Sequence, residues 1–164
     1  MPRPVAGTRV PFSDPWLQAA TRYLARFDRS AAQVEEFLRR KGASPQQAKQ
    51  TVLRLVGLRC LNDRAYGERW IESRLARQPV GRERLKAELL HKGLQGGLVE
   101  ELVREALGEV SEEDWARRAL ARRERQHRKL SSFQAVRLLR QWGFEEEAIT
   151  RIIEERRTAE GMET

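Results

Sequence analysis

Three segments of the chain share one pattern, which a helix that ends at a glycine explains. Residues 30–42, 81–93 and 131–143 each run from a small residue to a glycine twelve positions later, with a leucine four residues before that glycine. The three glycines recur about every fifty residues, a period typical of internal repeats. A helical unit of this size buries too little apolar surface to be stable alone, so such units pack against their neighbours. We therefore expect an array of helical modules that offers a surface to a partner, rather than a pocket enzyme.

Helix start signals extend this pattern along the chain. Ser-x-x-Gln capping boxes begin at Ser30, Ser44 and Ser131, and Asp14 precedes a proline that suits the first turn of a helix. Gly81 departs from the pattern, because it leaves its helix without a capping side chain. The signals predict nine helices, no strand and an all-α fold of three tandem three-helix, helix-turn-helix-like repeats forming an elongated curved array. The predicted parts are a leader (1–13), three repeats (14–58, 59–108 and 109–157) and a tail (158–164).

Apolar residues at helical spacing predict the core of each repeat. Tryptophans lie on these stripes, so core packing explains them better than stacking on nucleic-acid bases. The single cysteine, Cys60, lies in an apolar stretch and is expected to be a small packed residue. Other residues assigned to stripes are Trp16, Tyr23, Phe27, Leu53, Val56, Leu85, Leu89, Leu90, Trp115, Phe133 and Leu139.

Basic residues dominate the charge of the chain. The formal net charge is +8 and the isoelectric point is about 10.5, which favours a polyanion or an acidic protein face as partner. On a helix, Arg118, Arg122, Arg125 and Lys129 would form one continuous stripe. A solvated helical face is the alternative explanation for each cluster, but clusters recur in all three repeats. The candidate contacts for a partner or nucleic acid are Arg39, Arg40, Lys41, Arg82, Arg84, Arg118, Arg122 and Arg125.

The sequence offers little for catalysis. His91 and His127 are the only histidines, and neither lies in a metal-binding motif or beside a candidate nucleophile. We therefore expect no enzymatic activity, no catalytic residue, no cofactor and no metal. No apolar run approaches the roughly 20 residues of a membrane span, and the N-terminus lacks the apolar core of a secretion signal. These features predict a cytoplasmic protein with no membrane partner.

Four segments together resemble the bacterial regulatory protein RecX family. They are LRRKG at 38–42, LNDRAYGERWIESR at 61–74, GRERLKAELLHKGL at 81–94 and LLRQWGF at 138–144. The likeness covers about residues 15–156, and 61–94 is its most specific part. It implies tandem three-helix repeats and a non-catalytic, monomeric regulator in DNA repair and the SOS response. Such a protein binds the RecA recombinase filament on single-stranded DNA, lowers its ATP hydrolysis, strand exchange and coprotease activity, and also contacts single- or double-stranded DNA directly.

A helix-turn-helix transcriptional regulator is the alternative function. It would place the third helix of a repeat in the major groove, so the outer face of that helix should be basic. The segment after Gly93 instead carries Glu100, Glu101 and Glu105 against Arg104 alone, and 145–147 is a run of glutamates. These faces repel phosphate, which ranks the alternative below a RecA modulator. A hydrolase lacks any nucleophile constellation.

Overall fold

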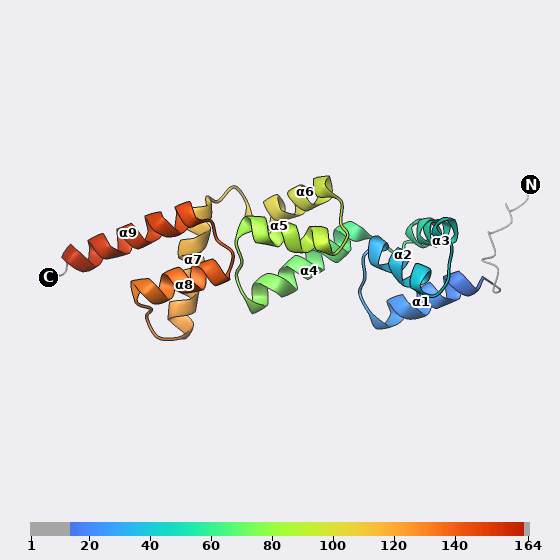
Figure 1. Cartoon of the computed structure of the whole chain (residues 1–164), viewed down its shortest axis with the longest axis horizontal. Helices are drawn as coiled ribbons and strands as arrows, with labels where there is room; N and C mark the ends of the chain where they lie inside the picture. The colour runs from blue at the N-terminus through green and yellow to red at the C-terminus, as the bar shows by residue number, and fades with distance from the viewer. Residues whose placement is uncertain (1–13, 163–164) are drawn as a thin grey trace, which may run out of the picture. The chain divides into compact units, whose positions relative to one another are not determined.

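The computed structural model describes residues 14–162, and the regular structure in that part of the chain is entirely α-helical (Figure 1). Within residues 14–162, nine helices follow one another in three sets of three, which confirms the predicted all-α fold of three-helix repeats. The predicted leader, residues 1–13, lies outside the described residues. The helices form two compact units, one of the described residues up to Tyr66 and the other of those from Gly67. The exact limits of the three repeats stay a prediction.

The helices of the first repeat begin at the caps that the sequence predicts. The Asp14 carboxylate accepts hydrogen bonds from the backbone N–H groups of Trp16 and Leu17, at 3.0 and 3.2 Å. Ser30 and Ser44 each form a reciprocal capping box with the glutamine three residues later. Such caps satisfy N–H groups that the first turn of a helix leaves without partners. The helices are α1 (Pro15–Arg26), α2 (Ala31–Arg40) and α3 (Pro45–Gly57).

The core of this repeat joins all three helices. Leu38, Val34 and Ala20 are fully buried, and Leu55 is 1% exposed. An ion pair of 2.8 Å between Arg54 and Asp14 adds a bond from α3 to the start of α1. The leucine four residues before the repeated glycine is therefore a core residue, as the spacing predicts.

The second repeat begins with a side-chain cap as well. The Asn62 Oδ1 accepts from the Ala65 N–H at 3.0 Å. A Cβ atom at Gly67 would lie 2.4 Å from Leu102 Cδ1, so α4 needs a glycine to lie this close to α6. Gly81 caps α5 without a side-chain hydrogen bond, which confirms the predicted departure. The helices are α4 (Asp63–Arg77), α5 (Arg82–His91) and α6 (Gly96–Leu107).

The third repeat is fastened by ion pairs between its first and last helices. Arg117 pairs with Glu155 at 2.8 Å, and Arg156 pairs with Glu124 at 2.8 Å. Ser131 forms the predicted capping box. The helices are α7 (Glu112–Gln126), α8 (Ser132–Gln141) and α9 (Glu146–Met162). The helix α9 continues past residue 157 into the predicted tail, because residues 158–160 contain neither glycine nor proline to stop it.

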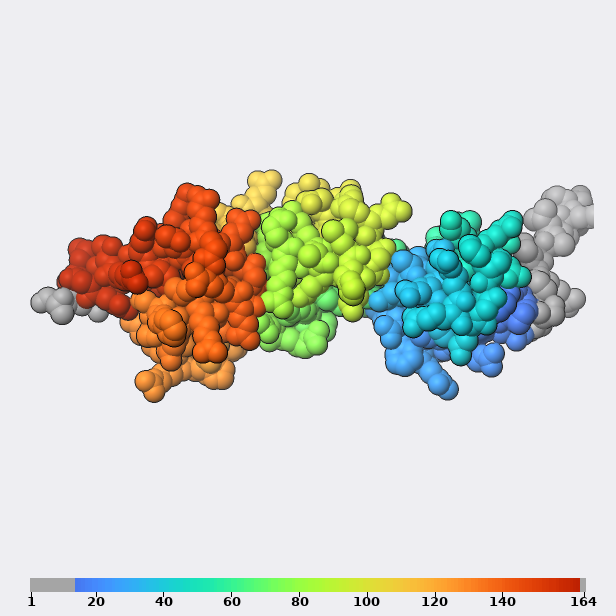
Figure 2. Space-filling model, viewed as in Figure 1, coloured from blue at the N-terminus to red at the C-terminus, as the bar shows by residue number. Residues whose placement is uncertain are grey.

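The second and third repeats lock together at one loop, which we call the junction loop (78–81). Its Gly81 N–H donates to the Trp142 carbonyl at 2.9 Å, and its Val80 carbonyl accepts from the Trp115 Nε1 at 2.7 Å. A Cβ atom at Gly81 would lie only 2.2 Å from the Gly143 carbonyl oxygen. In the space-filling view, the surface of α5 meets that of the third repeat (Figure 2). Repeats two and three are therefore joined backbone to backbone.

Several residues assigned to the apolar stripes are exposed instead. Phe133 is 76% exposed, Leu53 70% and Leu90 50%, and Cys60 also lies at the surface. A three-helix unit covers only one side of each helix, so the edges of a broad apolar stripe stay in water. Cys60 follows the turn that ends α3, where Arg59 has a left-handed φ of 59°. The predictions of burial were wrong at these four positions and also at Phe27 and Val56, which are 49% and 48% exposed.

Candidate functional site

Three candidate arginines lie on α7, but only two of them are available to a partner. Arg118 and Arg125 are exposed, and within residues 14–162 neither has an ion-pair partner. Seven residues apart, they share one side of the helix. Arg122 is half-buried, and its guanidinium donates to the carbonyls of Leu75 and Ala76, both at 3.2 Å. Arg122 therefore satisfies the C-terminal end of α4, where carbonyls lack helical partners and a cation is favoured.

The predicted basic stripe is shorter than the sequence suggests. The helix α7 ends at Gln126, and His127 caps it in an extended conformation with its N–H bonded to the Arg123 carbonyl. Lys129 follows this break and does not continue the helical face, so the prediction of a continuous stripe to Lys129 was wrong. We call Arg118, Arg122 and Arg125 the α7 basic face.

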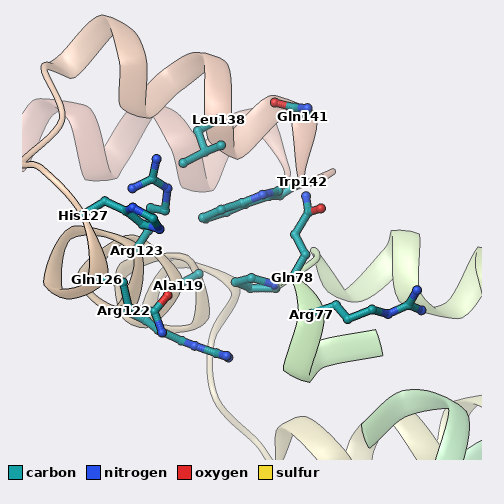
Figure 3. A pocket seen from close by; sticks show the side chains of 11 residues that line it. Arg77, Gln78, Ala119, Arg122, Arg123, Gln126, His127, Leu138, Gln141 and Trp142 are labelled. Atoms are coloured by element: carbon teal, nitrogen blue, oxygen red, sulfur yellow. The ribbon is translucent and has the colours of Figure 1, made fainter. Parts of the chain in front are cut away.

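A pocket of 330 Å³ lies beside the α7 basic face, between α4, α7 and α8 (Figure 3). We call it the junction pocket. Its charged or titratable lining consists of Arg77, Arg122, Arg123 and His127, and among the described residues no carboxylate lines it. Trp142 forms one wall (Figure 3). One guanidinium nitrogen of Arg123, Nη1, is buried without a hydrogen-bond partner. A basic pocket of this kind suits a carboxylate or phosphate group.

The arginines at the start of α5 serve the fold. The Arg82 guanidinium donates to the carbonyls of Gly108 and Val110 at 3.2 and 2.9 Å, which ties α5 to the linker before α7. Arg84 donates to the Gln141 carbonyl at the end of α8. The guanidinium groups of Arg82 and Arg84 both bond to backbone carbonyls of this chain, so the structure gives both candidates an internal function.

Glu88 joins two arginines of the second repeat. Its carboxylate accepts from Arg74 at 2.9 and 3.2 Å, in a two-pronged pair, and from Arg84 at 3.1 Å. Burial raises the pKa of Glu88, but the hydrogen bonds and charges of Arg74 and Arg84 outweigh burial and leave that pKa below its usual value. The ionised carboxylate therefore stabilises the folded state.

We expect the Glu88→Gln variant to be less stable by about 2 kcal/mol at pH 7, because charged hydrogen bonds are lost and Arg74 keeps a half-buried charge. The pKa of Glu88 is lower in the folded state, so its contribution is present above the unfolded value of about 4.3. That contribution disappears as the pH falls through the folded pKa. Urea unfolding at pH 7 and pH 3 tests this: the difference between wild type and variant should shrink at pH 3, and an equal difference at both would contradict it.

The remaining candidates lie at the end of α2, in the unit up to Tyr66. Arg39, Arg40 and Lys41 are all exposed. Arg40 has only a long ion pair of 3.8 Å with Glu36, and the Lys41 Nζ lies 5.7 Å from the centre of the Phe37 ring. These cations are accessible, but they belong to a different compact unit from the α7 basic face.

Comparison with known proteins shows which family the chain resembles. Residues 62–107, which span α4 to α6, match the family model described as RecX, second three-helix domain. The chain is 29% identical over 161 residues to "Regulatory protein RecX" of Streptomyces coelicolor, covering 94% of this chain and 85% of that protein. It is 33% identical over 98 residues to the protein of the same name from Amycolatopsis mediterranei, covering 58% and 54%. These matches make the chain similar to the RecX family over most of its length.

A solved structure supports the fold of this chain. The crystal structure of RecX from Lactobacillus salivarius superposes with a TM-score of 0.64, covering 85% of this chain and 93% of that one. The sequence identity is 21%, so this likeness establishes the fold alone.

The sequence did not reveal the junction pocket. Arg77 and Arg123 come together from segments that are 46 positions apart in the sequence, and no local motif signals that meeting. Trp142 is 4% exposed, as the general assignment of tryptophans to core stripes predicts, but it also walls the pocket. Across residues 14–162, no three His, Cys, Asp or Glu side chains gather closely enough to hold a metal ion. None of the described helices combines the length and apolar character of a membrane span.

Proposed function

We propose that this chain is a regulatory protein that binds the RecA recombinase on single-stranded DNA. In this proposal it lowers the ATP hydrolysis, strand exchange and coprotease activity of the filament. One observation carries the proposal. Two unpaired arginines, Arg118 and Arg125, are exposed on the helix that also contributes Arg122 and Arg123 to a basic pocket, on a chain whose relatives bear the name "Regulatory protein RecX".

The contacts in this proposal are acidic side chains of RecA. Exposed arginines of the α7 basic face attract them, and the junction pocket accepts one carboxylate beside Arg123. Charge complementarity of this kind sets the rate and register of association more than its strength. Several modest contacts on one chain then act together, as linked sites do. In the unit up to Tyr66, the accessible cations Arg39, Arg40 and Lys41 are further proposed contacts, whereas Arg82 and Arg84 contribute by holding the junction.

The chain regulates the filament if it binds one conformational state of the filament more tightly than the other. A bound protein shifts an equilibrium only by the difference between its affinities for the two states. We propose that it binds the less active state of the filament more tightly, which reduces turnover without any catalytic group on this chain. The proposal needs no cofactor and no second copy of the chain, and it places the protein in the cytoplasm with RecA.

A RecA ATPase assay on single-stranded DNA tests the proposal. We expect wild-type protein to inhibit, and we expect an Arg118→Glu/Arg125→Glu variant to need about tenfold more protein for half-inhibition. Losing two exposed ion pairs and adding repulsion costs roughly 1.4 kcal/mol, which corresponds to that factor. Arg122 is left intact because it holds α4.

A charge-matched control separates a specific face from a general charge effect. Arg104→Glu/Arg157→Glu makes the same change in net charge at two exposed positions, one on α6 and one on α9. This control should inhibit like wild type. Equal loss in both variants would show that net charge alone matters, and no inhibition by wild type at stoichiometric amounts would refute the proposed function.

A further inference from the structure

The junction pocket has more room and more positive charge than a single carboxylate can use. Its volume of 330 Å³ lies at the lower end of the range for small-molecule sites. Three arginines and one histidine contribute to its lining, and among the described residues no carboxylate does. One carboxylate would neutralise one of these charges and fill a small part of the volume. The pocket therefore suits a larger and more highly charged anion.

Arg123 is the cation of the pocket that lacks a partner. Its Nη1 is buried without a hydrogen bond, and within residues 14–162 its guanidinium belongs to no ion pair. Figure 3 shows this guanidinium on the same side of the pocket as His127. A guanidinium withdrawn from water without an acceptor costs free energy, and a bound anion would recover that cost. The polar lining is thus incomplete in the chain alone.

The other two arginines contribute charge rather than free donors. Arg122 is fixed in place, because its guanidinium donates to two carbonyls at the end of α4. The Arg77 guanidinium points away from the Trp142 ring in Figure 3 and is exposed. Side-chain amides supply further N–H donors for the oxygens of an anion. These amides belong to Gln78, Gln126 and Gln141.

A ligand in this pocket would contact the second and the third repeat together. Gln78 and Pro79 belong to the junction loop, whereas Arg123 and His127 come from the end of α7. Trp142 forms a wall of the pocket, and its carbonyl accepts the Gly81 N–H at 2.9 Å. The pocket thus lies beside the hydrogen bond that joins the two repeats. Binding there would hold the junction closed.

We propose that the junction pocket binds a free polyphosphate group, either pyrophosphate itself or the polyphosphate of a small phosphorylated molecule. Arg123 and the amides bond to its oxygens, and Arg77 and Arg122 balance its charge. The ligand fastens the second repeat to the third. This inference goes beyond the proposed function, in which the same pocket accepts a carboxylate of RecA. Binding of the free anion needs no RecA, and only the competition between the two ligands rests on the proposed function.

Two other kinds of anion compete with this assignment. A polycarboxylate carries its charges on groups separated by carbon atoms, so it needs more volume than pyrophosphate for the same charge. A phosphate in a nucleic-acid backbone carries one charge and is flanked by two sugars, so it brings less charge and more bulk. Guanidinium groups bind the oxygens of all three, and charge for a given size therefore separates them.

Isothermal titration of the full chain with pyrophosphate, without RecA, tests the site. We expect Arg123→Gln to weaken binding about tenfold, because a charged hydrogen bond and a unit of charge are lost. Arg118→Gln is the matched control: it makes the same change on the same helix, outside the lining of the pocket. It should bind like wild type. Equal weakening by both variants, or no binding of pyrophosphate by wild type, would overturn the proposal.

A second variant blocks the pocket without removing an arginine. Gln126→Glu places a carboxylate of the chain itself one turn from Arg122 and Arg123, and Gln126 is exposed, so the fold should be kept. Circular dichroism checks the fold. We expect this variant to lose at least tenfold in pyrophosphate affinity. Gln50→Glu, at an exposed position on α3, changes net charge equally and should bind like wild type. Equal affinity of the two variants would contradict the site.

Thermal unfolding tests whether the ligand holds the junction. Pyrophosphate at about a hundred times its dissociation constant should raise the midpoint of wild-type unfolding by about 5 °C, since it binds only the folded chain. At the same concentration, Arg123→Gln should show a smaller rise and Arg118→Gln the full one. An equal rise in all three proteins would indicate a general salt effect and overturn the proposal.

Competition identifies the anion. Citrate should bind at least tenfold more weakly than pyrophosphate, and an oligothymidylate without terminal phosphates should leave the pyrophosphate titration unchanged. Citrate binding as tight as that of pyrophosphate would assign the pocket to polycarboxylates, and displacement by the oligonucleotide would assign it to backbone phosphates. Either result would overturn the proposal. Because RecA is absent from these measurements, their failure leaves the ATPase result standing, and failed ATPase inhibition leaves pyrophosphate binding standing.

Discussion

Replacing Gly81 with serine should lower the free energy of unfolding by about 3 kcal/mol, although serine begins the matching helix in the other two repeats. Compared with glycine, a serine N-cap alone would stabilise α5 by only about 0.3 kcal/mol. The added Cβ, however, would lie 2.2 Å from the Gly143 oxygen and 2.7 Å from its carbonyl carbon. Backbone atoms cannot rotate away as side chains do, so the junction loop must separate from the third repeat. The destabilisation from the clash is therefore larger than the stabilisation from the N-cap.

Urea unfolding followed by tryptophan fluorescence measures this effect. Trp115 and Trp142 bond to the junction loop through the indole N–H and the carbonyl, so their emission reports on the junction. Gly97→Ala is the matched control, because a Cβ there meets nothing within 4 Å. It should be neutral or stabilise α6 by up to about 1 kcal/mol. A Gly81→Ser variant as stable as wild type would mean that the backbone contact is not close in solution.

Truncating Leu89 to alanine should cost about 3 kcal/mol, whereas truncating its neighbour Leu90 should cost less than about 1 kcal/mol. Leu89 is fully buried and Leu90 is 50% exposed. Removing the side chain of a buried leucine loses the free energy of its transfer from water and leaves a cavity. Both effects are smaller when the leucine is exposed. The two leucines differ only in the direction in which α5 presents them.

The same urea titration measures this pair. Both variants keep the helix propensity of α5, since alanine favours helix at least as well as leucine. Any difference between them therefore comes from packing. Equal losses for Leu89→Ala and Leu90→Ala would contradict the placement of α5 against α4 and α6.

Local sequence signals predicted the helices well. The boxes at Ser30, Ser44 and Ser131 form as expected, since a cap needs only residues within one turn. The glycines that end α2, α5 and α8 have φ values of 107°, 90° and 78°, which side chains rarely adopt. Such features are settled over a few residues, and sequence reasoning reaches them directly.

The candidate site was predicted only in part, because its members depend on distant neighbours. Arg118 and Arg122 look alike in the sequence, but Arg122 meets carbonyls 46 and 47 residues earlier in the chain. Arg82 likewise meets carbonyls of the following linker. An arginine can donate hydrogen bonds to the backbone carbonyls at the end of a helix, which have no partners within that helix. Which arginine lies close enough to do so is decided by the packing of the helices.

The exposure of Phe27 shows why an apolar stripe in the sequence does not by itself predict burial. Helical spacing assigned Phe27 to the core, yet it lies at the end of α1, where the partner helices no longer cover it. Spacing gives the direction of a side chain, while its burial depends on how far the neighbouring helix extends. Phe27 is therefore exposed because the apolar stripe of α1 extends beyond the helices that pack against it.

The close approach of Gly81 to Gly143 also limits how this chain can change over generations. In a uniform array, a repeat can be duplicated, deleted or exchanged, since each interface is like the next. Here a side chain at Gly81 would need a shift of the Gly143 backbone, and one at Gly143 would need a shift of Arg84 on α5. The second and third repeats are therefore free to diverge only as a pair. A chimaera that exchanges only one of these two repeats would keep one contact surface of the junction and lose the surface that matches it.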